Sequence, residues 1–143
     1  MYLSRKAAMG MVTAAAAVLA VAGTGAAHAE PDADGHYYGS IAMDMQDGAT
    51  GAAWNYPDYA SSDERALSEC GTRDCEIVVR FSDGCGAVAM AEDGTWAVGT
   101  GRDLRAAERA ALAGLGPLAP PFPNPGSASP MEARIMNSAC SPS

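Results

Sequence analysis

Four acidic side chains beside two predicted turns are the residues best suited to side-chain catalysis. Asp44 and Asp47 flank the first turn, and Glu92 and Asp93 stand at the second. Two opposed carboxyl groups can hydrolyse a glycosidic bond, one as an acid and the other as a base or nucleophile. Acids beside exposed hairpin turns are usually solvated, however, and a chain of this length has little room for a deep cleft. A small hydrolase using these carboxylates is therefore the alternative prediction.

Residues for nucleophilic catalysis or metal binding are scarce. A serine or cysteine nucleophile needs a base, and His36 is the one histidine beyond residue 29. Residues 30–143 contain no lysine. Asp32 and Asp34 lack the further oxygen ligands of a calcium loop. Met43 and Met90 occupy equivalent strand positions and are expected in the core rather than on copper. We predict no catalytic residue, no cofactor and no metal site.

The four cysteines predict disulfide bonds rather than a zinc site. They are Cys70, Cys75, Cys85 and Cys140. Their spacings match no zinc ribbon or knuckle, and an even number in a small exported domain is typical of a disulfide framework. Three pairings are formally open. We expect a local Cys70–Cys75 bond and a long-range Cys85–Cys140 bond, which contribute about 2 and about 4 kcal/mol on a chain-entropy treatment.

The first 29 residues are predicted to be a signal peptide. Arg5 and Lys6 precede an apolar run from 14 to 22, and residues 27–29 read Ala-His-Ala, a small-x-small cleavage pattern. A membrane anchor is the alternative, but a spanning helix needs about 20 strongly apolar residues, and this run is shorter and rich in alanine. We expect cleavage near Ala29 and a secreted, extracellular protein without a stable membrane anchor.

The part beyond the predicted cleavage point is small and strongly acidic. Residues 30–143 are 114 residues long, which suits one domain. They carry seven basic residues, all arginine, against 17 acids, a net charge of −10. Such a charge repels phosphate backbones and anionic lipid surfaces, so we expect no nucleic-acid partner. Cationic partners stay open, although acidity also keeps a secreted protein soluble. The oligomeric state is not predicted.

Two segments carry the same order of features. The strand "YGSIAM" at 38–43 matches "CGAVAM" at 85–90, and an Asp-Gly turn, a returning strand and a helix follow each. The helices are expected at about 58–70 and 103–115, and each ends at a glycine. "CEIVVRF" then alternates apolar and polar residues like a half-buried strand, and "ARIMNSAC" is its weaker counterpart. This matched order favours duplication over chance similarity of alanine- and glycine-rich segments.

The repetition predicts the architecture. One strand-turn-strand-helix unit cannot bury its apolar faces alone, and a second copy supplies the missing half of the core. We predict an α+β fold in which two pseudo-repeated strand-turn-strand-helix-strand units form a mostly antiparallel sheet with two helices on one face. The predicted organisation is a signal peptide at 1–29, a flexible leader at 30–37 and a single domain at 38–143, with repeat halves 38–82 and 85–140 and a proline-rich loop at 116–130.

Short motifs in both halves resemble a known family. The matching residues are Tyr38-Gly39-Ser40-Ile41-Ala42, Asn55-Tyr56-Pro57, Cys70-Gly71, Asp74-Cys75 with Val78, Val79 and Phe81, and Cys85-Gly86-Ala87-Val88-Ala89. In this order they resemble small secreted actinobacterial proteins grouped as a domain of unknown function. The resemblance runs to about Gly116. At the end of the second helix Leu115 stands where such proteins often have a cysteine, and a proline-rich segment replaces their compact last strand. It implies an exported protein with a host- or envelope-interacting role and no assigned activity.

Aromatic residues at the ends of the returning strands are the candidate interaction surface. Trp54, Tyr56, Tyr59 and Trp96 could form one shared patch, and aromatic residues are enriched at recognition surfaces. The alternative is that they pack under the helices. We predict a non-enzymatic extracellular or envelope interaction module with a protein or envelope partner. A protease inhibitor is a further alternative, and the segment around Phe122 is its candidate reactive loop.

Overall fold

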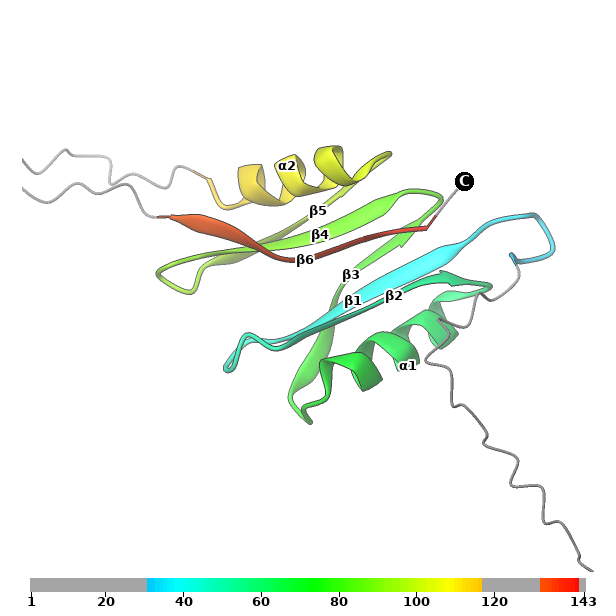
Figure 1. Cartoon of the computed structure of the whole chain (residues 1–143), viewed down its shortest axis with the longest axis horizontal. Coiled ribbons are helices and arrows are strands. Elements are labelled where there is room, and N and C mark those ends of the chain that lie inside the picture. The colour runs from blue at the N-terminus through cyan, green and yellow to red at the C-terminus, as the bar shows by residue number, and fades with distance from the viewer. Residues whose placement is uncertain (1–30, 117–131, 142–143) are drawn as a thin grey trace, which may run out of the picture.

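The structure is a computed structural model of the chain and describes residues 31–116 and 132–141 (Figure 1). The predicted signal peptide, most of the proline-rich loop and the segment around Phe122 lie outside the described residues. Six strands and two helices follow one another in two similar sets. They are β1 (Tyr38–Asp44), β2 (Thr50–Tyr56), α1 (Tyr59–Cys70), β3 (Cys75–Ser82), β4 (Cys85–Ala91), β5 (Trp96–Gly101), α2 (Leu104–Gly114) and β6 (Ala133–Cys140).

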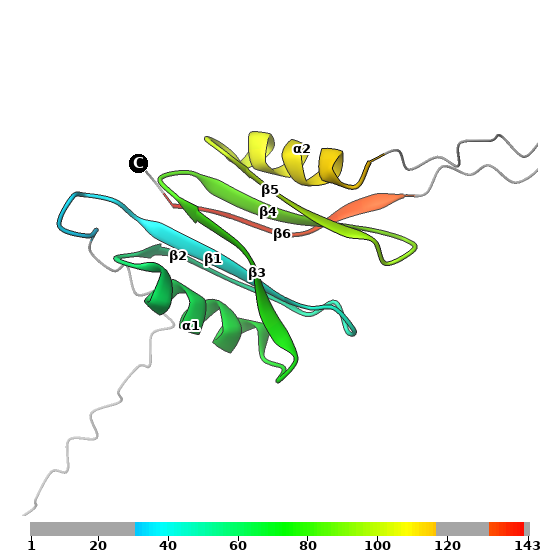
Figure 2. The ribbon, with the colours of Figure 1, turned by 180° about the vertical axis from the view of Figure 1, so that it is seen from behind.

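The strands form two antiparallel three-stranded sheets, in the orders β2-β1-β3 and β5-β4-β6. The sheets lie face to face, α1 covers the outer face of the first, and α2 covers the outer face of the second (Figures 1 and 2). The α+β class, the antiparallel pairing and the two related units are confirmed. The arrangement differs in two respects from the predicted single sheet with both helices on one face: each half builds its own sheet, and the helices lie on opposite sides (Figure 1).

Burial of both faces of the central strands explains this arrangement. Along β1, Ile41 and Met43 point toward the other sheet, whereas Ala42 points toward α1, and all three side chains are fully buried. In β4, Val88 lies in the layer between the sheets and Ala89 packs against α2. Each sheet therefore has two apolar faces to bury, and its own helix buries only one of them. The other sheet buries the second.

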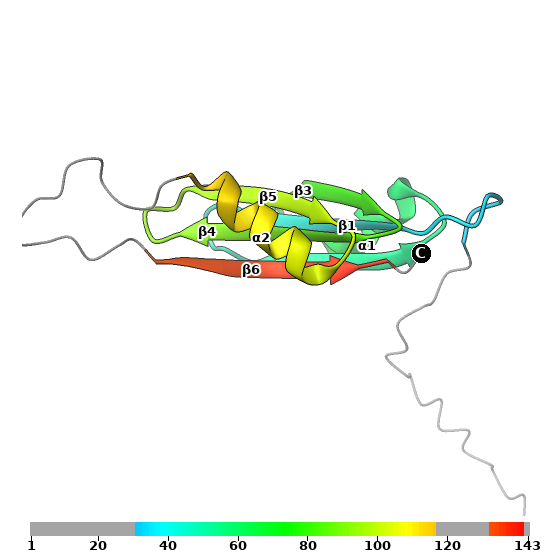
Figure 3. The same ribbon diagram turned by 90° about the horizontal axis from the view of Figure 1, so that it is seen from above.

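The two halves share their strand register. In the pairing of β1 with β3, the register shifts after Ile41, and in the pairing of β4 with β6 it shifts at the equivalent place, after Val88. Seen from above, β6 lies over β2 and β5 lies over β3, with β4 over β1 between them (Figure 3). A two-fold axis that runs along the strands between the sheets generates this exchange of outer strands. The shared irregularity supports the predicted duplication.

Both helices begin at an aspartate and lie directly on strand backbone. Asp58 accepts a hydrogen bond from the Ser61 amide at 2.7 Å, and Asp103 accepts one from the Ala106 amide at 2.8 Å. A Cβ atom placed on Gly51 would overlap the backbone of α1, and one on Gly99 would lie 2.5 Å from a carbonyl oxygen of α2. The small residues of each repeat therefore allow each helix to approach its sheet closely.

Disulfide bonds are confirmed, with the two predicted pairings. Cys70–Cys75 joins the end of α1 to the start of β3. Cys85–Cys140 joins partners that stand opposite each other in the pairing of β4 with β6. Each half thus carries one bond. Within the described ranges, no helix is long and apolar enough to cross a membrane.

Candidate functional site

The two tryptophans of the predicted patch lie on opposite edges of the sandwich. Trp54 belongs to β2, which lies against β6, and Trp96 belongs to β5, which lies against β3. Each side chain is 42% exposed. The structure therefore does not bring the four predicted aromatic residues into one surface, because the two-fold relation places the returning strands of the two halves on different sides.

The tyrosines form a separate cluster at the start of α1. The rings of Tyr59 and Tyr38 meet edge to face, with centroids 4.7 Å apart. The guanidinium carbon of Arg80 lies 6.0 Å from the centroid of the Tyr59 ring, within cation–π range. Tyr56 pairs with Tyr38 across the strands and packs against the core layer under α1. Trp54 is close to Tyr56 in sequence, but it lies exposed on the edge strand.

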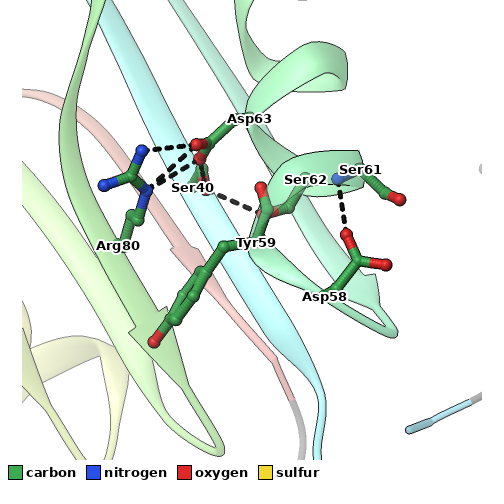
Figure 4. A network of polar contacts seen from close by, with 7 residues as sticks. All are labelled: Ser40, Asp58, Tyr59, Ser61, Ser62, Asp63 and Arg80. Atoms are coloured by element: carbon green, nitrogen blue, oxygen red, sulfur yellow. Dashed lines mark hydrogen bonds and ion pairs between the residues drawn. The ribbon is translucent and has the colours of Figure 1, made fainter.

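A polar network ties α1 to its sheet beside this cluster (Figure 4). Arg80 donates to both carboxylate oxygens of Asp63, with Nη2 at 2.6 Å from Oδ2 and Nε at 3.1 Å from Oδ1. Ser40 donates to the same carboxylate and contacts the Ser62 hydroxyl at 2.8 Å. Burial opposes the charge on Asp63, but the hydrogen bonds from Arg80 and Ser40 outweigh it and lower the pKa of this carboxyl.

The second half has a simpler link at the equivalent place. Ser138 of β6 donates to Glu108 of α2 at 2.9 Å. The registers of the two sheets place Ser138 where the first half has Arg80, since these residues face Ala87 and Ser40 respectively. The shared role is a connection from helix to edge strand. In the sequence, the only indication of these links is a polar residue in an alternating strand. Such a residue does not show which helix side chain it contacts.

A groove lies where β3 turns into β4. We call it the arginine groove, and it has a volume of about 390 Å³. Arg80 and Arg102 line it, together with Tyr59, the hydroxyl residues Ser82 and Thr100, and the acid Asp83. The sequence analysis missed this groove, because its arginines come from opposite halves and are 22 positions apart in the chain.

Residues 31–37, the described part of the predicted flexible leader, fold back onto the rim of the groove. Asp32 accepts hydrogen bonds from the His36 amide at 2.8 Å and from the Tyr38 hydroxyl at 2.9 Å. His36 Nδ1 contacts the Asp83 carboxylate, which also accepts a 3.0 Å hydrogen bond from the Tyr37 amide. The hydrogen bond and the charge of Asp83 raise the pKa of His36. The same contacts lower the pKa of Asp83, with the Tyr37 amide as the largest cause.

Two of the four carboxylates that suggested hydrolysis, Asp44 and Asp93, hold the backbone of their own turns. Asp44 is only 2% exposed, and its oxygens accept from the Thr72 hydroxyl at 2.6 Å and the Gln46 amide at 2.8 Å. These bonds lower the pKa of Asp44, with the Thr72 hydroxyl as the largest cause. Asp93 accepts from the Thr95 amide at 2.9 Å, which lowers its pKa as well. Among the described residues, no group of three or more His, Cys, Asp and Glu side chains could hold a metal ion.

The chain belongs to the family described as "Domain of unknown function (DUF4189)", whose model matches residues 38–119. The matched range covers both helices and the two hairpins. It ends before β6, where the described structure resumes beyond the proline-rich segment.

Similar proteins come from mycobacteria. "Protein Rv1269c" of Mycobacterium tuberculosis is 40% identical over 79 residues, which are 55% of this chain and 61% of that protein. "Uncharacterized protein Rv1813c" of the same species is 42% identical over 72 residues, 50% of this chain and 48% of that protein. The chain thus spans between about half and three fifths of these relatives. The NMR structure of Rv1813c superposes with a TM-score of 0.52 and 27% identity, and the superposition covers 95% of this chain and 99% of that one.

Proposed function

We propose that this protein is exported and acts outside the cytoplasm as a non-enzymatic interaction module, with a protein or cell-envelope component as its partner. The observation that carries the proposal is the exposure of one tryptophan on each edge of a rigid sandwich. Trp54 and Trp96 are each 42% exposed, on strands that pair with a neighbour on one side only. A tryptophan gains free energy when a partner covers it, and such residues dominate binding at many interfaces.

The disulfides support the extracellular part of the proposal. Each half holds one bond, and both cysteine pairs are placed by the fold itself rather than by a flexible tail. Disulfides persist in oxidising compartments and are rare in the cytosol. The signal-like sequence at residues 1–29 provides the route.

Export is tested by expressing the full chain in an actinobacterial host and separating medium, envelope and cytoplasm. We expect the protein outside the cytoplasm, with Glu30 as its first residue by mass spectrometry. An Ala27→Asp, Ala29→Asp variant removes the small residues of the cleavage pattern and should retain the longer form. A full-length cytoplasmic protein with free thiols would contradict the proposal.

Binding is tested with immobilised protein and detergent-solubilised envelope from the same host. We expect Trp54→Ala or Trp96→Ala to weaken capture of a specific component by about 30-fold, the effect of losing a central aromatic anchor of about 2 kcal/mol. Leu67→Ala is the matched control, because Leu67 is also exposed but lies on α1. Capture that is equal for all four proteins would refute the role of the tryptophans.

A further inference from the structure

Two glycines, Gly84 and Gly101, are among the residues that line the arginine groove. Gly84 and Gly101 approach so closely that a Cβ atom on Gly84 would lie 2.8 Å from the Gly101 carbonyl oxygen. The positions before and after them carry polar groups, since Ser82 and Asp83 precede Gly84 and Arg102 follows Gly101. A compact ligand could therefore sit against the backbone while donors reach it from both walls.

One guanidinium of the groove is held in place with donors to spare. Arg80 uses Nε and Nη2 on Asp63 and lies over the Tyr59 ring, so its orientation is set on two sides. Its Nη1 group has no hydrogen-bond partner among the described residues. A guanidinium whose geometry is already fixed loses less conformational entropy on binding than a free one.

The second half supplies another guanidinium, that of Arg102, and the Thr100 hydroxyl, whereas the Ser82 hydroxyl comes from β3, like Arg80. The Arg102 side chain is 94% exposed, and its Nε lies 3.6 Å from Asp103, too far for a strong hydrogen bond. The hydroxyls of Ser82 and Thr100 have no side-chain partners within the described ranges. The groove thus gathers two cations and two neutral donors from both halves of the molecule.

One acid, Asp83, lines the groove, and two more, Asp63 and Asp103, lie next to its arginines; all three already have partners. Asp63 is matched by Arg80, and the Asp83 carboxylate contacts His36 and the Tyr37 amide. Asp103 caps α2 through its other oxygen. The formal charges of Arg80, Arg102, Asp63, Asp83 and Asp103 sum to −1. Attraction for an anion therefore comes from the directed donors that no carboxylate uses, Nη1 of Arg80 and the Arg102 guanidinium, and not from a positive local charge.

We propose that the arginine groove binds the phosphate group of a small, soluble phosphate monoester. Two guanidinium groups and two hydroxyls from opposite walls match a tetrahedral group with three oxygens better than a flat carboxylate with two. A volume of about 390 Å³ leaves room for the carbon skeleton of a sugar or polyol next to Tyr59. The negative charge of the whole chain, −8, opposes docking on an anionic membrane or a nucleic acid.

The site is independent of the proposed tryptophan contacts. Trp54 lies on the other edge of the sandwich. Trp96 is the first residue of β5, whereas the groove is lined by Gly101 at the opposite end of that strand. The Trp54→Ala and Trp96→Ala variants should therefore keep phosphate binding, so the two proposals fail separately.

The test is an NMR titration of the purified, isotope-labelled protein at constant ionic strength. The probes are inorganic phosphate, a hexose 6-phosphate, the same hexose without phosphate, and acetate. We expect saturable amide shifts confined to residues 82–84 and 100–102 with both phosphate compounds, none with the hexose, and at least tenfold weaker binding of acetate. Phosphatidylcholine vesicles containing phosphatidic acid should leave the spectrum unchanged.

Arg102→Gln should weaken phosphate binding at least tenfold. Arg105→Gln is its matched control, because it removes the same charge from an exposed position three residues further on, in the first turn of α2, and should change the affinity less than twofold. Equal melting temperatures of both variants would show that neither disturbs the fold. The proposal is overturned if phosphate causes no saturable shift, if the two variants bind equally, if acetate binds as well as phosphate, or if only the vesicles bind.

Discussion

At the residue scale, three acidic side chains connect segments that are distant in sequence. Asp44 joins the first hairpin to the loop after α1 through Thr72, and Asp63 joins α1 to β3 through Arg80. Asp83 holds the segment before β1 against the turn between the sheets. A carboxylate that accepts several hydrogen bonds is stabilised in its charged form, which lowers its pKa. The acidity of the chain therefore has a structural use beyond solubility.

The contact between His36 and Asp83 predicts a pH-dependent anchor for residues 31–37. The pKa of His36 is raised above its ordinary value of 6.5, because the histidine donates to Asp83 and lies near Asp32 and Asp34. A raised pKa in the folded state means that the stabilisation is fully present below pH 6.5 and is lost as the pH rises through the higher folded-state pKa. We expect the Tyr37 amide signal to report release of the segment as the pH rises above 6.5 and through the raised pKa of His36.

An NMR titration from pH 5 to pH 9 measures this release. In His36→Gln the Tyr37 amide should show no transition in the neutral range, whereas the cores of both sheets should be unchanged in both proteins. A transition of equal size in the variant would show that another group controls the segment. The acidic limb is separate, because the lowered pKa of Asp83 makes its contribution fall away only in acid.

At the element scale, alanine and glycine set the distance between each helix and its sheet. Ala66 of α1 and Ala107 of α2 are completely buried on the faces of the helices that contact the sheets. They face strand positions that also lack large side chains. Close approach of backbones gains dispersion contacts but leaves no room for an added methyl group. The alanine-rich composition of the repeats is thus a packing requirement.

Gly51→Ala and Gly99→Ala should each lower the free energy of unfolding by about 3 kcal/mol, the upper range for overpacking a core. The added methyl groups meet helix backbone, which cannot rotate away. Gly94→Ala is the control, because its φ is +83° but nothing lies within 4 Å of the added atom, so only the backbone cost of about 1 kcal/mol applies. Urea denaturation measures all three. Equal losses in the three variants would contradict close helix packing.

At the scale of the whole molecule, the two sheets complete one another around a single large side chain. The ring of Phe81 lies between Gly39 and Gly86, the equivalent glycines of the two repeats, and it is only 4% exposed. The position matching Phe81 in the second half is Ala139, which pairs with Gly86 as Phe81 pairs with Gly39. One ring therefore fills a space that two symmetric rings could not share.

The two disulfides should contribute unequally to this assembly. Cys85–Cys140 closes 55 residues of sequence separation and Cys70–Cys75 closes 5. On the chain-entropy treatment, replacing the first pair by serine should cost about 4 kcal/mol and replacing the second about 2 kcal/mol. Guanidinium denaturation of the two double variants compares them. A larger loss for Cys70–Cys75 would show that the local bond acts through native contacts rather than through the unfolded chain.

The sequence by itself determined the local elements and their duplication. Asp58 and Asp103 begin the helices, Asp-Gly pairs mark turns, and the paired cysteines are bonded as predicted. These features depend on residues close together in the chain or on a repeated order, so a linear pattern carries them.

Only the tertiary structure decided how the halves meet. Residues on both faces of β1 and β4 are small or apolar, but their sequence does not say whether a helix or another sheet covers each face. The stacking of one sheet on the other separated Trp54 from Trp96 and brought Arg80 to Arg102 in one groove. The physical reason is that contacts between the halves depend on how one whole layer is oriented on the other. The volume of side chains such as Phe81 favours one orientation, but only when both layers are already formed.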